Sequence, residues 1–422
     1  MNYTLSRLKN GVRVLTVALP KMESATITVW VGVGSRFEPA KVSGLSHFLE
    51  HMVFKGSEKR PSAKLIAEAV DSIGAEFNAS TSKEWTNFHI KARVGVMDIA
   101  FDVLSDMVLR PILKSEEIER EKGVIVEEIA MYEDTPVAKI GDVFEQLIFK
   151  GSSLGRDIAG TKETVRGIKR NDFVNYRSKH YFAKNILITV AGGIDTKNVL
   201  KLANAYFGNV PAGKKSKIEL AKKQKKPQVL LHSKKKEQAH FILGFLGNRR
   251  GNKDRFAEAI LSSILGGGMS SRLFTEVRER RGLAYAVRAS FDHYVDTGYF
   301  AAYAGVDLKR IDEAIKVTLD QCIGLADGRY PVKKDELKKA KEYVKGHLAL
   351  SLEDTEDINK FFGEEELILE KVITPEYVYK QIDKVNLEEV LRVAKKVFVT
   401  KNINLAIIGP YKDQSRFERL LA

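Results

Sequence analysis

The sequence has little cysteine and lacks long apolar segments. Among 422 residues, Cys322 is the single cysteine, so an internal disulfide cannot form and cross-links play no part in the fold. No apolar run approaches the roughly 18 residues that a membrane-spanning helix needs. The first residues also lack the long apolar core of a secretory signal. These absences favour a cytoplasmic protein with no membrane span.

The sequence also lacks an excess of acidic residues, because its formal net charge is +14 at pH 7. Much of the positive excess lies in one lysine-rich stretch between residues 214 and 236. Such a stretch can form an anion-binding surface for nucleic acid or acidic peptides, or it can be a solvated linker. We favour the linker, since no aromatic residues are interleaved with the lysines, and we do not expect nucleic acid as a partner.

Three segments of the first half of the chain have counterparts in the second half, in the same order. The offsets are 212, 220 and 217 residues, taken from Val29 to Phe241, from Pro111 to Pro331 and from Asn185 to Asn402. Repeats at a nearly constant offset indicate duplication. We predict one domain at residues 1–212 and a second at 228–422, joined by a basic linker at 213–227.

Residue patterns predict strands in adjacent pairs and helices in adjacent pairs. Strands are expected near 3–5 and 12–14 around a turn at Asn10 and Gly11, then at 25–34, 76–82, 86–94 and 186–193, and helices at 61–73, 96–109, 115–132, 171–181 and 199–207. Because strands and helices do not alternate strictly, we predict an α+β fold. In it, each of two duplicated domains is a largely antiparallel sheet packed with helices.

The stretch from Gly44 to Met52 contains the pattern His-x-x-Glu-His, formed by His47, Glu50 and His51. On a helix both imidazoles project from one face, about one turn apart. That separation suits two nitrogen ligands of a tetrahedral Zn²⁺, and Glu50 borders the same face, where its carboxylate can take a proton from water. A pair of structural histidines without a metal is the alternative. The equivalent helix of the second half, at 257–265, has no histidine.

A hydrolytic zinc site usually has three protein ligands and one open position, so a further ligand is expected. Glu121 and Glu128 lie seven residues apart on the helix predicted after Pro111, which places both on one face. Glu127 points about 100° away from Glu128 on the same helix. For each of these glutamates the alternative is an exposed helix charge.

Together these motifs resemble the insulinase/pitrilysin family of inverted zinc peptidases, and within it the mitochondrial-processing-peptidase-like branch with two domains. In that family a ligand glutamate follows the histidine motif after 76 intervening residues, and counting from His51 leads to Glu128. The resemblance implies zinc bound by His47, His51 and Glu128. It also implies that Glu50 is the general base and that Glu121 is a supporting carboxylate behind the ligands.

In the second half, the segment 266–285 resembles the glycine-rich segment of the same family and the arginine–tyrosine pair that follows it. The resemblance implies that Arg278 and Tyr285, seven residues apart, bind the substrate backbone and help to stabilise the oxyanion. Arg280 and Arg281 are nearby alternatives. A flexible turn followed by surface charges is the interpretation without a function.

The segment 74–81 resembles the edge strand that lies beside the zinc in this family, along which a substrate peptide adds as an extra strand. The resemblance implies that Asn78 and Ala79 meet the backbone of that peptide. An ordinary strand without a ligand is the alternative.

The resemblance as a whole implies a zinc-dependent metalloendopeptidase that cleaves peptides or unfolded protein segments with metal-activated water. Larger members of the family enclose the substrate between four such domains. This chain has two, so we expect a homodimer that completes the chamber. The alternative is a non-catalytic or partner subunit of a processing-peptidase-like complex.

Overall fold

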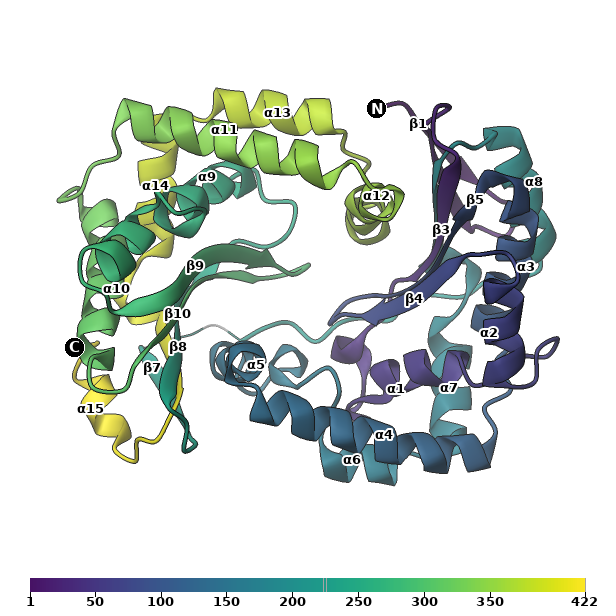
Figure 1. Ribbon diagram of the computed structural model, residues 1–422, viewed down its shortest axis with the longest axis horizontal. Coiled ribbons are helices and arrows are strands. Elements are labelled where there is room, and N and C mark those ends of the chain that lie inside the picture. Colours follow the sequence, from purple (N-terminus) through teal and green to yellow (C-terminus); the bar gives the residue numbers. More distant parts are fainter. Residues whose placement is uncertain (223, 225, 422) are drawn as a thin grey trace. The chain divides into compact units, whose positions relative to one another are not determined.

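The computed structural model describes residues 1–222, 224 and 226–421, which belong to two compact units (Figure 1). Unit 1 comprises Met1–Ala130, Arg156–Glu219 and Leu350–Thr374, and unit 2 comprises Met131–Gly155, Leu220–Ala349 and Pro375–Ala422. Each unit therefore combines segments from both halves of the sequence. The domain boundaries expected at 212 and 228 describe the repeat in the sequence, and they stay a prediction. Residues 223 and 225 of the expected linker lie outside the described residues.

Unit 1 is built on a six-stranded sheet in the part of the chain that the structure describes. Its strands, in spatial order, are β1 (Tyr3–Arg7), β2 (Arg13–Ala18), β6 (Ile186–Gly192), β3 (Ser24–Val31), β5 (Thr86–Arg93) and β4 (Glu76–Thr81). Among these strands β2 and β6 pair in parallel and all other neighbours are antiparallel, so the sheet is largely antiparallel, as predicted. Gly11 turns the chain between β1 and β2 with a φ of +102°, which favours glycine and confirms the expected turn.

Helices cover both faces of this sheet (Figure 1). The helices of unit 1 are α1 (Leu45–Val53), α2 (Ala63–Asp71), α3 (Met97–Leu109), α4 (Ser115–Asp134, whose last residues belong to unit 2), α6 (Lys162–Gly167), α7 (Arg170–His180), α8 (Thr196–Phe207) and α12 (Thr355–Leu369). α3 and α8 contact one face, and α12 contacts β6 and β3 from the other. A central strand covered on both faces is buried along its whole length, and every residue of β6 is buried.

Unit 2 repeats the arrangement with five strands in its described residues. In spatial order they are β7 (Gln228–Ser233), β11 (Ile403–Gly409), β8 (Gln238–Gly247), β10 (Gly298–Asp307) and β9 (Ala284–His293), with β7 and β11 parallel and the rest antiparallel. Its helices are α5 (Pro136–Ile148), α9 (Arg255–Gly266), the π-helix η6 (Phe274–Glu279), α10 (Ile311–Asp327), α11 (Lys334–Ser351, whose last two residues belong to unit 1), α13 (Pro375–Lys384), α14 (Leu387–Val397) and α15 (Gln414–Glu418). The shared strand order confirms a duplicated α+β fold.

Helices α5 and α12 hold equivalent places in the repeat and are exchanged between its halves. α5 begins at Pro136 and α12 at Thr355, an offset of 219 that lies within the range of the repeat. α5 packs on β11 and β8 of unit 2, whereas α12 packs on β6 and β3 of unit 1. Gly363 lets α12 approach Trp30, because a Cβ at this glycine would lie 2.7 Å from the indole ring. The sequence did not predict this exchange, since an apolar helix face does not specify which sheet it covers.

Most of the predicted elements are present with small shifts of their ends. α4 extends to Asp134 rather than to 132, and α8 begins at Thr196 rather than at 199. Within the described ranges, none of the helices has both the length and the apolar character that crossing a bilayer requires.

Candidate metal centre

Helix α1 carries the histidine motif and begins with a cap that comes from the preceding loop. Gly44, directly before the helix, has a φ of +96° and offers no side chain to the first backbone N–H groups. The buried carboxylate of Glu38 accepts hydrogen bonds from the N–H of Gly44 at 2.7 Å and from the N–H of Ser46 at 2.6 Å. Burial raises the pKa of Glu38 to about 7, although these N–H groups favour its ionised form. The first turn of α1 is therefore fixed by the fold itself.

His47 and His51 project from α1 toward Glu128 on α4, so the three side chains form one cluster. His47 Nε2 lies 3.6 Å from Glu128 Oε1, and His51 Nε2 lies 3.5 Å from Glu128 Oε2. One candidate ligand atom from each side chain lies within 4.8 Å of the other two. Burial, together with the neighbouring His51, lowers the pKa of His47 to about 4, so its imidazole is neutral at pH 7 and can offer a lone pair.

These separations fit a divalent metal better than direct hydrogen bonds. Two donor atoms at about 2.0–2.1 Å from a tetrahedral zinc lie about 3.3 Å apart, whereas an N–H···O hydrogen bond spans about 2.7–3.2 Å. Within the described residues, the buried atom Glu128 Oε2 has no hydrogen-bond partner. A buried carboxylate oxygen without a donor is costly, and a cation would satisfy it. His47, His51 and Glu128 are therefore the side chains that can hold a zinc ion.

Glu121 lies behind the cluster on the same face of α4. Its Oε1 lies 2.9 Å from His51 Nδ1, and its Oε2 lies 2.7 Å from Lys55 Nζ. Burial raises the pKa of Glu121, but hydrogen bonds from His51 and Lys55 outweigh burial and hold the pKa below its usual value. An ionised Glu121 favours the His51 tautomer with the proton on Nδ1, which leaves Nε2 free to face Glu128. Glu127 is exposed and stands outside the cluster.

Glu50 lies on α1 next to His51, and its half-buried carboxylate is contacted by β4. The Thr81 hydroxyl donates a hydrogen bond to Glu50 Oε2. Burial raises the pKa of Glu50 above its usual value; Thr81 and His51 oppose this shift, and the negative charge of Glu128 adds to it. A carboxylate of raised pKa beside a candidate metal centre is suited to accept a proton from water.

Strand β4, which contains Asn78 and Ala79, is the edge strand of the unit 1 sheet. It pairs with β5, and no other described strand pairs with its second edge. Asn78 is exposed, and its side chain accepts a hydrogen bond from the Ala79 N–H at 2.9 Å. Because β4 also contacts α1, a peptide added to this edge would lie beside the histidine helix.

Arg278 and Tyr285 lie together on unit 2, the first on η6 and the second at the start of β9. The guanidinium carbon of Arg278 lies 4.8 Å from the ring centroid of Tyr285 and 4.8 Å from that of Phe274. The cation is thus stacked against two aromatic rings. Tyr285 is 78 % exposed, so most of its ring is open to a ligand.

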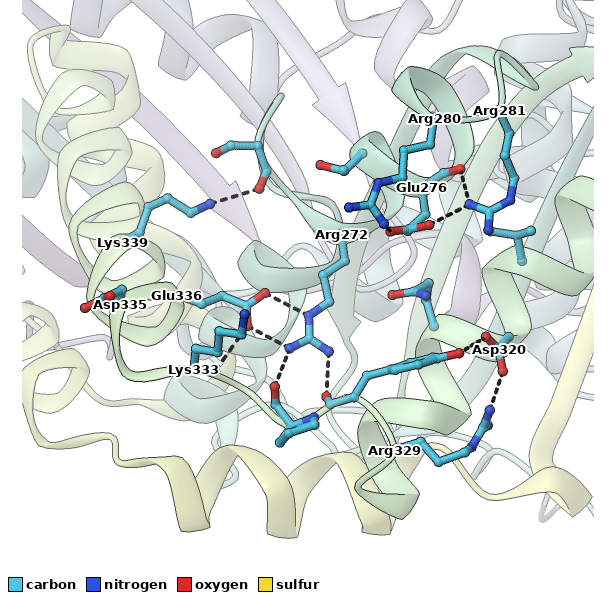
Figure 2. A pocket seen from close by; sticks show the side chains of 16 residues that line it. Arg272, Glu276, Arg280, Arg281, Asp320, Arg329, Lys333, Asp335, Glu336 and Lys339 are labelled. Atoms are coloured by element: carbon cyan, nitrogen blue, oxygen red, sulfur yellow. Dashed lines mark hydrogen bonds and ion pairs between the residues drawn. The ribbon is translucent and has the colours of Figure 1, made fainter.

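Arg280 and Arg281, the neighbouring alternatives, are both bound to Glu276, as Figure 2 shows. Arg280 Nη1 lies 2.6 Å from Glu276 Oε1, and Arg281 Nη1 lies 2.5 Å from Glu276 Oε2. Both line a pocket of about 800 Å³ on unit 2, which Arg278 and Tyr285 do not line. Arg278 differs from them because its closest carboxylate among the described residues is that of Glu279, at 3.8 Å.

Sequence reasoning missed four residues that the structure adds to these groups: Glu38, Lys55, Thr81 and Phe274. Lys55 follows His51 by four residues and Phe274 precedes Arg278 by four, so helical spacing was an available signal for both. No spacing rule indicates the other two, because a loop and a strand bring them to α1 through tertiary structure.

Comparisons with known protein families match both halves of the chain. Residues 13–162 match the model described as insulinase (peptidase family M16), and residues 167–344 match the model described as the peptidase M16 inactive domain. The chain is 35 % identical over 414 residues to an uncharacterized zinc protease of Streptomyces coelicolor, covering 96 % of this chain and 89 % of the relative. It is 38 % identical over 406 residues to the uncharacterized zinc protease YmxG of Bacillus subtilis, covering 95 % and 97 % respectively.

A solved structure also has a similar fold. A protease from Helicobacter pylori matches with a TM-score of 0.89 over 97 % of this chain and 99 % of that one, at 23 % sequence identity. At this identity the likeness supports the fold alone, whereas the two relatives above, matched over nearly the whole chain, identify the family. The chain belongs to the insulinase family, peptidase family M16, and has its two-domain architecture.

Proposed function

We propose that the protein is a zinc-dependent metalloendopeptidase that cleaves peptides or unfolded protein segments. The observation that carries this proposal is the convergence of His47, His51 and Glu128, where a buried carboxylate oxygen has no hydrogen-bond donor among the described residues. Relatives that are named zinc proteases support the same cofactor and the same reaction.

The proposed chemistry assigns one task to each polar side chain around the cluster. Zinc, when bound there, supplies a Lewis acid that makes water acidic enough to attack a carbonyl at neutral pH. Glu50 accepts the proton of the attacking water on its carboxylate and then passes it to the nitrogen of the leaving amine. Glu121 holds His51 at Nδ1, at 2.9 Å, so that the Nε2 atom keeps its direction toward the cluster.

Substrate binding in this proposal uses the edge strand and the arginine–tyrosine pair. A peptide adds to β4 as an extra strand at Asn78 and Ala79, and main-chain hydrogen bonds give most of the affinity, so specificity is loose. Arg278 and Tyr285 donate hydrogen bonds to the substrate backbone and to the oxyanion that forms when the carbonyl is attacked.

The proposed assembly is a homodimer, in which two chains provide four domains and enclose the substrate. In that dimer Arg278 and Tyr285 of one chain act on a peptide bound at the zinc centre of the other. A closed chamber admits peptides and unfolded segments and excludes folded proteins. The proposed location is the cytoplasm, which suits a chain whose single cysteine, Cys322, is buried and free.

Metal analysis and peptide cleavage test the proposal with one set of purified proteins. We expect the wild-type chain to contain about one zinc and to cleave an unfolded peptide until a chelator is added. Glu128→Gln should lose most of the zinc and about 1,000-fold or more of the cleavage rate, because a neutral amide replaces an anionic ligand. Glu127→Gln, which changes an exposed neighbour on α4, is the matched control and should retain both.

Three outcomes would change the assignment. A Glu128→Gln chain that keeps its zinc and its cleavage rate would contradict the third ligand. Zinc without cleavage in the wild-type chain would contradict the peptidase and favour the other role considered from the sequence, a non-catalytic or partner subunit of a processing-peptidase-like complex. Cleavage that begins only when a different chain is added would identify the partner subunit.

A further inference from the structure

The last residue of β4 contacts the carboxylate that serves as general base in the proposed function. The Thr81 hydroxyl donates a hydrogen bond to Glu50 Oε2. Among the described residues, no other hydrogen bond reaches the Glu50 carboxylate. One of its oxygens is therefore held, and Oε1 remains open to a further donor such as water.

The side chain of Thr81 faces α1 because exposure alternates along β4. Phe77, Ala79 and Thr81 are half-buried and the residues between them are exposed, so these three share the face of the strand that packs on α1. Phe77 packs on Phe54, directly after α1, with ring centroids 5.3 Å apart. The hydroxyl therefore reaches Glu50 as part of a strand–helix contact rather than from a side chain on the open surface.

The turn after Thr81 is anchored to the segment that leads into α1. The carbonyl oxygen of Ser82 accepts a hydrogen bond from the Ser35 N–H at 3.1 Å. Gly34 is required for this close approach, because a Cβ there would lie 2.2 Å from the same carbonyl oxygen. A donor on a backbone held in this way loses little conformational entropy when it fixes its acceptor.

We propose that Thr81 is a positioning residue that orients Glu50 for proton transfer, an inference that rests on the proposed peptidase function. By holding Oε2, the hydroxyl directs Oε1 of the same carboxylate toward the attacking water. The proton of that water moves to Oε1 and then to the nitrogen of the leaving amine, and Thr81 itself exchanges no proton. Ala79, which meets the substrate in the proposed function, lies two residues from Thr81 on the same strand. In this proposal β4 therefore both binds the substrate and positions Glu50.

The valine variant of Thr81 tests this role, because valine keeps the branched shape and the strand preference but lacks the hydroxyl. We expect Thr81→Val to lower kcat about 10- to 100-fold, since the carboxylate can then rotate away from the productive orientation. KM should stay within about twofold and the zinc content should not change, because neither the edge of β4 nor a proposed ligand is altered. Thr81→Ser restores the hydroxyl and should recover most of kcat.

Thr86→Val is the matched control on the neighbouring strand. Thr86 pairs with Thr81 across β4 and β5, but its hydroxyl donates to the Val33 carbonyl oxygen, at 3.0 Å, instead of to Glu50. Its loss should lower the melting temperature, because a buried carbonyl oxygen loses its donor, and should leave kcat of the folded protein within about twofold. Normal kcat in Thr81→Val, or a change equal to that of Thr86→Val, would overturn the positioning role.

Crystal structures of the wild-type, Thr81→Val and Thr81→Ser chains separate this inference from the proposed function. If the wild-type chain does not cleave peptides, the proposed function fails. The Glu50 carboxylate should nevertheless occupy one position in the wild type and in Thr81→Ser, and a different or divided position in Thr81→Val. The same Glu50 position in all three structures would overturn the inference, whether or not the wild-type chain is a peptidase.

Discussion

Helix α1 of unit 1 and helix α9 of unit 2 occupy equivalent places in the repeat but differ in how their polar side chains are satisfied. α1 follows the central strand β3 and precedes the edge strand β4, and α9 follows β8 and precedes the edge strand β9. The two helices therefore have the same scaffold around them. The polar side chains that they carry decide what each unit can bind.

In unit 2 the buried carboxylate is bound entirely within the protein. Glu258 on α9 is fully buried, Asn248 Nδ2 donates to its Oε1 at 2.6 Å, and His293 Nε2 lies 2.8 Å from its Oε2. In unit 1, by contrast, the buried atom Glu128 Oε2 has no hydrogen-bond partner among the described residues, and the two oxygens of Glu128 lie 3.5 Å from His51 Nε2 and 3.6 Å from His47 Nε2. Unit 2 thus holds a closed polar network, and unit 1 holds an open cluster that suits a cation.

A histidine held by a glutamate is found in both units, so this pair does not by itself indicate a metal site. His51 is held by Glu121 in unit 1, and His293 by Glu258 in unit 2. Within the described residues, the only group of three metal-binding side chains with atoms close enough to share an ion is the one that contains His51. A buried acceptor without a hydrogen-bond donor, such as Glu128 Oε2, is a better indicator of a metal site than a histidine–glutamate pair.

The largest expected effect tests the open cluster through Glu50→Gln. Removing the proton acceptor should lower the rate of peptide cleavage about 100- to 10,000-fold, the usual contribution of a general base. The zinc content should not change, because Glu50 is not a proposed ligand. Cleavage kinetics and metal analysis of the same preparation measure both quantities, and cleavage at the wild-type rate would remove Glu50 from the mechanism.

Mixing Glu50→Gln with Arg278→Ala chains extends this test to the proposed dimer. Each variant alone should cleave poorly. A verified mixed dimer contains one centre with an intact Glu50 and, from the other chain, an intact Arg278, so it should recover up to about half of the wild-type activity. Mixed dimers that stay as inactive as their parents would contradict sharing of the site between chains.

The next effect tests the closed network of unit 2 through Glu258→Leu. This change removes the acceptor of Asn248 and His293 and should lower the free energy of unfolding by about 2–4 kcal/mol, as denaturant titration measures. Glu258→Gln retains one acceptor and should lose less. The zinc content of the folded chain should not change in either variant. If Glu258→Leu lost its zinc but kept its stability, Glu258 would belong to a metal site rather than to a closed structural network.

The parts of the site that depend on spacing along one helix could be predicted from the sequence. His47, Glu50 and His51 lie within about one turn of α1, and Glu121 and Glu128 lie two turns apart on α4, so the helical period places each set on one face. The meeting of α1 with α4 followed from the family resemblance rather than from residue pattern. No local pattern specifies which helices pack together.

The parts that depend on tertiary contacts could not be predicted in this way. The loop carboxylate of Glu38 caps α1 from six residues before Gly44, and the Thr81 hydroxyl reaches α1 from an edge strand. The exchange of α5 and α12 escaped prediction for the same reason. The pairing of neighbouring strands was more accessible, because adjacent segments with strand periodicity usually pair with each other, as β1 with β2 and β4 with β5 do. The position of β6 between β2 and β3 was not predicted.

The smallest expected effect compares the two histidine–glutamate pairs through Glu121→Gln. The amide keeps an acceptor for His51 Nδ1 but loses the charge that favours this tautomer, together with the ion pair to Lys55 at 2.7 Å. We expect the zinc affinity to fall about 10- to 100-fold, as is usual when the partner of a metal-binding histidine is changed. Competition with a chelating indicator measures this affinity directly.

The control for this change is Glu119→Gln on the same helix, where an exposed glutamate pairs with Lys122 at 2.7 Å. It removes one negative charge from α4 without touching the cluster, so the zinc affinity should stay the same. If the negative charge of α4 alone mattered, both variants would bind zinc more weakly. If Glu121 acts by orienting His51, only Glu121→Gln would bind zinc more weakly. If Glu121→Gln binds zinc as tightly as the wild type, the pair in unit 1 only stabilises the fold, as we infer for Glu258 and His293 in unit 2.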